Sequence, residues 1–231
     1  MKLLLYDLDG TLLYTHGLGR RVVAGVLTDL LGRPVEAHGA DFSGKTDPQI
    51  FRELLEREHG THGDVGDLAA AVREAVRIYE GRMDAALRTT RVTALPGAAA
   101  ALAATAAHEG ALVGLLTGNL QPLAYGKLRA AGLDTAHVVE GVGGFGSDHE
   151  DRDCLGPVAL ARAEAHAGRP FEGADTIIVG DTPRDIACAR AIGATAVAVT
   201  TGNFCAEALA GADYILPSLE PLDTLLGLLS A

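Results

Sequence analysis

The sequence predicts a doubly wound α/β fold, a parallel sheet with helices on both faces, with an all-helical segment inserted near its beginning. Two observations lead to this prediction. After residue 96, short apolar runs alternate with stretches of helical spacing, which is typical of parallel strands joined by crossover helices. Between about 18 and 85, by contrast, apolar residues recur only at helical spacing, and the sequence offers no strand candidate.

The first element is the apolar run KLLLY at 2–6. We interpret it as a buried strand, because Gly10 prevents a long helix from following directly. Three helical stretches are expected within 18–85, where apolar residues lie three or four positions apart. Glycine-rich breaks separate these stretches near 32–34, 39–44 and 60–66.

The elements after Pro96 and Gly97 alternate along the chain. Helices are expected at 97–108, 121–131, 157–167, 183–192 and 222–229. Strands are expected at 111–116, 137–140, 176–179, 195–199 and 214–216. Residues 141–151 are rich in glycine and acidic side chains, so we expect a loop there.

The charge balance limits the kinds of partner. The 231 residues include 19 Lys and Arg against 30 Asp and Glu, which gives a net charge of −11. A surface this acidic repels phosphate backbones, so a general nucleic-acid binder is not expected. A small anionic substrate is still allowed, provided that its site is locally positive.

Cysteine usage and hydropathy indicate the compartment. The chain has three widely spaced cysteines, which argues against a disulfide framework and for a reducing compartment. No uncharged apolar run reaches the roughly 18 residues that a membrane span needs. We therefore expect a cytoplasmic protein, monomeric or homodimeric, without a membrane partner.

Three of the expected strands end in polar clusters. The clusters are Asp7-Leu8-Asp9-Gly10-Thr11, Thr117-Gly118-Asn119 and Gly180-Asp181-Thr182-Pro183-Arg184-Asp185. Ligands of open α/β sheets bind outside the carboxyl ends of the strands, and parallel strands bring those ends to one edge. Each cluster alone is common in turns and helix caps. All three together, each at a strand end, predict an active site.

The carboxylates of these clusters suit a divalent cation. Asp7 and Asp9 are two residues apart, so an extended backbone places both on the same side, where they repel unless a cation neutralises them. Asp181 and Asp185 add two more, and this number of hard oxygen ligands suits Mg²⁺. One carboxylate could then act as nucleophile and another as general acid and base.

The second cluster is suited to an anion. Thr117 and the backbone N–H groups of Gly118 and Asn119 precede an expected helix. The start of a helix offers unpaired N–H groups that bind phosphate oxygens. The three residues are therefore candidate phosphate ligands.

The string DLDGTL, followed by TGN and GDTPRD, resembles the motifs of the haloacid dehalogenase-like hydrolases over nearly the whole chain. The resemblance implies a Rossmann-like catalytic core formed by 1–13 and 86–231. It also implies that 14–85 is a helical cap domain, inserted just after the first motif.

The resemblance also implies roles for the carboxylates. Asp7 would attack phosphorus, and Asp9 would protonate the leaving oxygen and then activate water. Mg²⁺ would be held by Asp7, the Asp9 carbonyl oxygen and Asp181, with Asp185 binding it through water or supporting a ligand. The carboxylate of Asp9 favours phosphatase or phosphomutase chemistry, because the family's dehalogenases lack it.

Thr117 would bind the transferring phosphoryl group, but the family's next basic residue is not where the motif usually places it. Between Asn119 and Asp181 the only lysine is Lys127, which falls inside a helix soon after the second motif. We interpret that position as wrong for the role and take Arg152, in the loop before the next helix, as the substitute. The alternative is that Arg152 pairs with a nearby acidic residue: Asp148, Glu150, Asp151 or Asp153.

The lysine of the expected cap is a candidate substrate contact. Lys45 lies in the string SGKTD, which is similar to the substrate-facing cap loop of phosphoglycolate phosphatase-type enzymes. The alternative is a surface lysine between Gly44 and Thr46.

These observations lead to one functional hypothesis and two alternatives. The hypothesis is a Mg²⁺-dependent phosphatase that acts on a small phosphorylated metabolite, a phosphoglycolate-like ester or a sugar phosphate, through an aspartyl-phosphate. The alternatives are a phosphomutase of the β-phosphoglucomutase type and a non-catalytic binding protein on the same fold.

Overall fold

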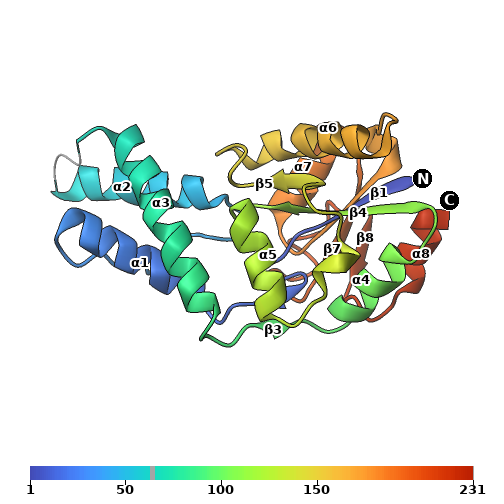
Figure 1. Ribbon diagram of the computed structural model, residues 1–231, viewed down its shortest axis with the longest axis horizontal. Helices are drawn as coiled ribbons and strands as arrows, with labels where there is room; N and C mark the ends of the chain where they lie inside the picture. The colour runs from blue at the N-terminus through green and yellow to red at the C-terminus, as the bar shows by residue number, and fades with distance from the viewer. Residues whose placement is uncertain (63–65, 231) are drawn as a thin grey trace.

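A six-stranded parallel sheet forms the centre of the molecule, as the sequence predicts (Figure 1). The computed structural model describes residues 1–62 and 66–230. The strand order is β5-β4-β1-β6-β7-β8, and each neighbouring pair is parallel. The bounds are β1 Lys2–Tyr6, β4 Ala111–Thr117, β5 Gly143–Phe145, β6 Thr176–Gly180, β7 Thr195–Val199 and β8 Tyr214–Leu216.

Helices cover both faces of this sheet (Figure 1). One face is covered by α6, Leu155–Ala167, and α7, Pro183–Ile192. The other face carries α4, Ala98–Ala106, α5, Gln121–Ala130, and α8, Asp223–Ser230. The fold is therefore doubly wound, as expected.

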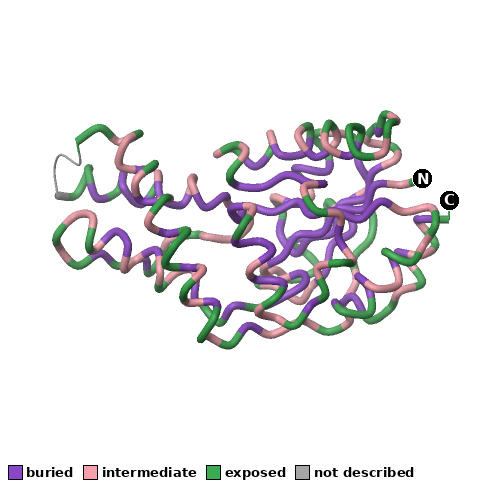
Figure 2. The backbone as a smooth tube through the Cα atoms, viewed as in Figure 1, coloured by how far each residue is buried: buried purple, intermediate pink, exposed green. Residues whose placement is uncertain are grey.

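Strand β1 shows why both faces need a cover. Leu3 and Leu5 pack in the core beneath α6 and α7, while Leu4 and Tyr6 pack in the core on the other face. All four residues are fully buried, and much of the chain at the centre of the molecule is coloured as buried in Figure 2. A strand buried on both faces has a continuous apolar sequence, which is why KLLLY is recognisable.

Three helices form the insertion between β1 and the rest of the sheet. They are α1, Leu18–Leu31, α2, Asp47–His62, and α3, Leu68–Leu87. The helices pack on one another through α2–α3 and α1–α3 contacts, including an edge-on pair between Phe51 and Tyr79 with ring centroids 5.3 Å apart. They lie beyond one end of the sheet, opposite the end where both termini are found (Figure 1). The break expected at 60–66 lies partly within 63–65, outside the described residues.

Two short strands that the sequence does not predict join the insertion to the sheet. Strand β2, Leu13–Tyr14, pairs antiparallel with β3, Thr93–Ala94. The chain therefore leaves and re-enters the sheet region through adjacent segments. The division into a 14–85 cap and a core of the remaining residues stays a prediction.

The strand expected at 137–140 is wrong. The chain forms a short 3₁₀ turn at Thr135–His137, and the strand β5 lies instead within the expected loop, at Gly143–Phe145. Val138 is buried, so the apolar signal reflects packing against the core and not sheet pairing. A Cβ on Gly143 would lie 2.0 Å from the Leu115 carbonyl oxygen, so the strand needs glycine there for close packing. Glycine carries no strand signal in a sequence, which explains the error.

Among the described helices, none is both long enough and apolar enough to span a membrane.

Candidate active site

The three motifs meet at the carboxyl edge of the sheet. Asp7 directly follows β1, Thr117 ends β4, and Asp181 directly follows β6. Strand β1 lies between β4 and β6, so the ends of these strands are neighbours. A cavity of about 500 Å³ lies between this edge and the helical insertion, and Asp7, Thr117 and Asp181 all line it.

Three buried carboxylates lie close together at the site. Oxygen atoms of Asp7, Asp181 and Asp185 lie within 4.8 Å of one another. Burial raises the pKa of Asp7 to about 7, an effect that Arg152 opposes and that the charge of Asp185 reinforces. Burial, reinforced by the charges of Asp185 and Asp7, also raises the pKa of Asp181 to about 9. Carboxylates this close together repel one another unless a positive group neutralises them.

This cluster fits a hard divalent cation such as Mg²⁺. All its ligand atoms are carboxylate oxygens, which Mg²⁺ prefers. The backbone also closes tightly around Asp181: a Cβ would lie 2.3 Å from its Oδ2 at Gly10 and 1.7 Å at Gly202. Glycine at both positions lets Asp181 reach the cluster.

Asp185 is held by its own helix and by Arg152. Its Oδ2 accepts hydrogen bonds from the Thr182 backbone N–H at 2.9 Å and from the Thr182 hydroxyl at 2.7 Å. Its Oδ1 is paired with the Arg152 guanidinium. Both oxygens are therefore occupied, which favours the supporting role expected for Asp185 over direct coordination.

Adding Mg²⁺ to the metal-free protein is expected to raise its Tm, and to raise it more at about pH 8 than at about pH 5.5. The folded-state pKa values of Asp7 and Asp181 lie above the ordinary value of 3.8, so the stability they contribute is present below about pH 4. That stability is lost as the pH rises through about 7 for Asp7 and about 9 for Asp181. The cation therefore relieves more repulsion at higher pH.

The measurement is thermal unfolding with and without Mg²⁺ at the two pH values. A cation at a hundred times its Kd contributes about 2.7 kcal/mol of stability. For a chain of this length each kcal/mol is worth about 2–4 °C in Tm. Asp181→Asn is the matched variant and should lose the Mg²⁺ effect. A wild-type Tm that Mg²⁺ leaves unchanged at both pH values would contradict the assignment of the cluster.

Arg152 lies beside these carboxylates. It begins a short 3₁₀ turn just before α6, and its Nη2 is 3.3 Å from Asp7 Oδ1. The same nitrogen pairs with Asp185, and the side chain is buried. Arg152 therefore contacts two carboxylates of the site, and not the nearby acidic residues that the alternative named.

The second motif contacts Asp9, which also lines the cavity. Asn119 Nδ2 donates to Asp9 Oδ2 at 2.9 Å and to Thr117 Oγ1 at 2.7 Å. Lys127 Nζ lies 2.5 Å from the same Asp9 oxygen and 2.5 Å from Asn119 Oδ1. Arg152 thus lies beside Asp7, and Lys127 lies beside Asp9.

The sequence interpretation set Lys127 aside for the role of the family's basic residue, but the structure places it in the cavity lining, against Asp9. Its place along the chain is unlike that of the family's basic residue, but α5 brings its side chain to the cavity. The available signal is its place in the apolar stripe of α5, where Leu123, Ala124 and Leu128 are buried. A lysine in such a stripe needs a buried partner.

The loop before α2 closes the site from the side of the insertion. Asp47 N–H donates to the Gly118 carbonyl oxygen at 2.8 Å, and Asp47 Oδ2 accepts from Leu120 N–H at 3.0 Å. A Cβ on Gly118 would lie 2.0 Å from the Lys45 carbonyl oxygen, so glycine in the second motif allows this contact. Burial raises the pKa of Asp47 to about 6.

Lys45 lines the cavity, as its predicted role requires. Its side chain is 8% exposed, which argues against a free surface lysine. The ammonium pairs with Glu53 Oε2 at 2.5 Å, so its charge is partly compensated.

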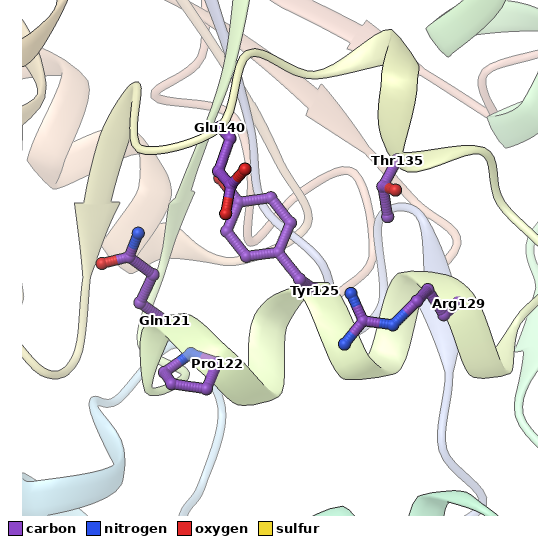
Figure 3. A pocket seen from close by; sticks show the side chains of 6 residues that line it. All are labelled: Gln121, Pro122, Tyr125, Arg129, Thr135 and Glu140. Carbon is purple, nitrogen blue, oxygen red and sulfur yellow. The ribbon is translucent and has the colours of Figure 1, made fainter.

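A second cavity, of about 360 Å³, is lined partly by side chains of α5 (Figure 3). Its lining residues are Gln121, Pro122, Tyr125, Arg129, Thr135 and Glu140. Gln121, Tyr125 and Arg129 are four residues apart and share one face of α5, while Lys127 lies on another. No residue of the three motifs lines this second cavity.

Solved structures with the same fold include several enzymes. CbbY from Rhodobacter sphaeroides, in complex with phosphate, aligns with a TM-score of 0.72 and 19% identity over 96% of each chain. A hydrolase from Pseudomonas syringae aligns with a TM-score of 0.67 and 22% identity over 98% of each chain. β-Phosphoglucomutase from Clostridium difficile has a TM-score of 0.69 and 14% identity, covering 100% of this chain and 97% of its own. No curated protein sequence matches this chain significantly.

These sequence identities are too low to establish the family of this chain, but a family model establishes it. The model of the haloacid dehalogenase-like hydrolases matches residues 4–190, well over half of the chain. The matched range begins within β1 and includes all three motifs, Lys127 and Arg152. The chain therefore belongs to the haloacid dehalogenase-like hydrolase family.

Proposed function

We propose that this hydrolase is a Mg²⁺-dependent phosphatase that acts on a small phosphate monoester through an aspartyl-phosphate at Asp7. The observation that carries the proposal is the position of Asp7 within the acidic cluster and beside Arg152, with Asp9 lining the same cavity. One cavity therefore brings together a candidate nucleophile, Asp7, a candidate acid–base group, Asp9, and the positive charge of Arg152 for a phosphoryl group.

The first step transfers the phosphoryl group to the protein. A carboxylate oxygen of Asp7 forms a bond to phosphorus as the bond from phosphorus to the ester oxygen breaks. Asp9 gives its proton to the departing oxygen, so an alcohol leaves and Asp9 becomes a carboxylate.

In the second step Asp9 takes up a proton, the reverse of its role in the first. Water attacks phosphorus while Asp9 takes its proton, and the bond from Asp7 to phosphorus breaks. Inorganic phosphate leaves, Asp7 is again a carboxylate and Asp9 again carries a proton. Each group therefore returns to its starting state.

Positive charge must balance the phosphoryl group in a chain of net charge −11. Bound Mg²⁺, held by Asp7 and Asp181 and, as the family resemblance implies, by the Asp9 carbonyl oxygen, would neutralise charge on the transferring group. Arg152 supplies fixed charge beside Asp7, and its Nε is buried with no partner among the described residues. Thr117 and the N–H groups of Gly118 and Asn119 are the further candidate ligands for phosphate oxygens.

The helical insertion 14–85 is proposed to act as a cap that selects the rest of the substrate. A cavity of about 500 Å³ suits a small metabolite, and Lys45 lines it beside Arg20 and Tyr79. CbbY has been crystallised with phosphate and, as a variant, with xylulose-1,5-bisphosphate. A sugar phosphate or a phosphoglycolate-like ester is the substrate class we favour here.

A phosphomutase is the second candidate, favoured by the likeness in fold to β-phosphoglucomutase from Clostridium difficile. The products separate the two: the phosphatase releases inorganic phosphate, and the mutase returns an isomerised sugar phosphate.

The test is phosphate release from a panel of small phosphate esters, with Mg²⁺ and with EDTA. We expect release that depends on Mg²⁺ and differs among the esters, and none from an Asp7→Asn preparation, which controls for contaminating phosphatases. Isomerised sugar phosphate without free phosphate would establish the mutase. Silence across the panel, from protein that Mg²⁺ stabilises, would favour a non-catalytic protein.

A further inference from the structure

Lys127 is a buried cation to which the proposed chemistry gives no task. Its side chain is 5% exposed, and its Nζ lies 2.5 Å from Asp9 Oδ2 and 2.5 Å from Asn119 Oδ1. Asn119 Nδ2 donates to the same Asp9 oxygen at 2.9 Å. The three side chains therefore close a ring of hydrogen bonds.

This ring fixes the orientation of the Asp9 carboxyl group. Both donors converge on Oδ2, and rotating the group would break both bonds at once. Oδ1, by contrast, receives a single long contact within the described residues, from the Thr15 hydroxyl at 3.4 Å. Oδ1 is thus the oxygen left available to a substrate in the cavity.

The ring also determines which carboxyl oxygen of Asp9 carries a proton when the group is an acid. A carboxylate and a carboxylic acid both have an oxygen that can accept hydrogen bonds. Because Lys127 and Asn119 occupy Oδ2 as donors, a proton has its place on Oδ1 in the acid. The same two bonds then hold the group in both of its states.

We propose that Lys127 is a positioning residue: with Asn119 it holds Asp9 so that Oδ1 gives the proton to the leaving ester oxygen and later takes one from water. The inference rests on the proposed phosphatase function. In the first step the proton moves from Asp9 Oδ1 to the ester oxygen as that oxygen's bond to phosphorus breaks and the bond from Asp7 forms.

The main alternative is that Lys127 binds the transferring phosphoryl group directly. The contacts favour the positioning role, because Arg152 is the cation against Asp7, while the described partners of Lys127 are Asp9 and Asn119. The lysine lies in the buried stripe of α5, and it does not line the second cavity.

The two roles predict different dependence on the leaving group. An alkyl phosphate needs a proton on its departing oxygen, whereas p-nitrophenolate is stable enough to leave without one. The ratio kcat/KM reports the steps up to departure of the leaving group, so it isolates the acid role of Asp9. A residue that acts on the phosphoryl group affects both esters alike.

The experiment measures kcat/KM of the wild type and of Lys127→Met for an alkyl phosphate and for p-nitrophenyl phosphate. We expect a loss on the order of 10²-fold for the alkyl ester and of less than about tenfold for the nitrophenyl ester. Arg152→Lys is the matched comparison and should lower both values by a similar factor. Methionine keeps the apolar stem, and thermal unfolding checks the fold. Lys127→Leu, which also removes the donor, replaces Lys127→Met if that variant does not fold.

Each outcome decides the inference. Equal losses on both esters, or no loss on either, overturn the positioning role while leaving the phosphatase function standing. Wild-type protein that hydrolyses neither ester in the presence of Mg²⁺ overturns the phosphatase function and this inference with it.

Discussion

Replacing Asp7 with asparagine is expected to lower phosphate release by at least about 10⁴-fold, as removal of a nucleophile does in other enzymes. An amide oxygen is a poor nucleophile and forms no stable phosphoryl ester. The side chain keeps its size, so the packing behind β1 is unchanged. The measurement is the steady-state rate with the best ester of the panel.

The fold should survive this change. The variant removes one of three carboxylates that lie within 4.8 Å of one another, and burial already raises the pKa of Asp7 to about 7. Loss of its charge therefore costs the metal-free protein little. Asp84→Asn, at an exposed carboxylate of α3 that pairs with Arg88, is the matched control and should keep full activity. Normal turnover by Asp7→Asn would refute the nucleophile assignment.

Replacing Arg152 with alanine is the second large change. It removes the fixed positive charge beside Asp7, and loss of one such stabilising group costs about 10²–10³ in kcat in other enzymes. The same change leaves Asp7 and Asp185 without their buried partner, and breaking a buried ion pair costs roughly 3–5 kcal/mol of folding stability. Both turnover and Tm should therefore fall.

Two further variants separate these effects. Arg152→Lys keeps the charge but loses the planar fork that pairs with two carboxylates at once, so it should recover stability better than turnover. Arg190→Ala removes an exposed arginine whose ion pair with Asp213 is worth about 0–1 kcal/mol, and it controls for loss of a basic residue. Unchanged kinetics in Arg152→Ala would move its role to another residue.

The parts of the fold that follow simple periodicity could be predicted from the sequence. The strand at 2–6 is an unbroken apolar run because it is buried on both faces, and the helices of the insertion show apolar residues at helical spacing because each buries one side. Strand β5 could not be predicted, because Gly143 and Gly144 are chosen for close backbone packing and carry no strand signal.

The site residues at the strand ends could be predicted from the sequence. The contacts that depend on how helices pack could not. Sheet topology alone brings Asp7, Thr117 and Asp181 together. The partners of Arg152 lie far away in the sequence, just after β1 and in α7, so its four acidic neighbours along the chain were misleading. The Lys127 contact depends on how α5 lies over the sheet edge, which spacing along the chain does not reveal.

The contact between the insertion and the sheet edge shows the same limit. Asp47 bonds to Gly118 and Leu120, which are more than seventy residues further along the chain. Neither strand signals nor helix signals encode such a pair. Only the string SGKTD, through its likeness to a family cap loop, pointed to this region.

The most direct test of the central claim is to detect the phosphoryl group on Asp7 during turnover. The reaction with the best ester is quenched with acid within a turnover and digested with pepsin at the same low pH, which limits hydrolysis of the acyl phosphate, and the fragment that contains Asp7 and Asp9 is sequenced by mass spectrometry. We predict the mass of one phosphoryl group on Asp7 when Mg²⁺ is present, and none with EDTA or in Asp7→Asn. Phosphate release without this adduct, or an adduct on another residue, would contradict the proposed mechanism.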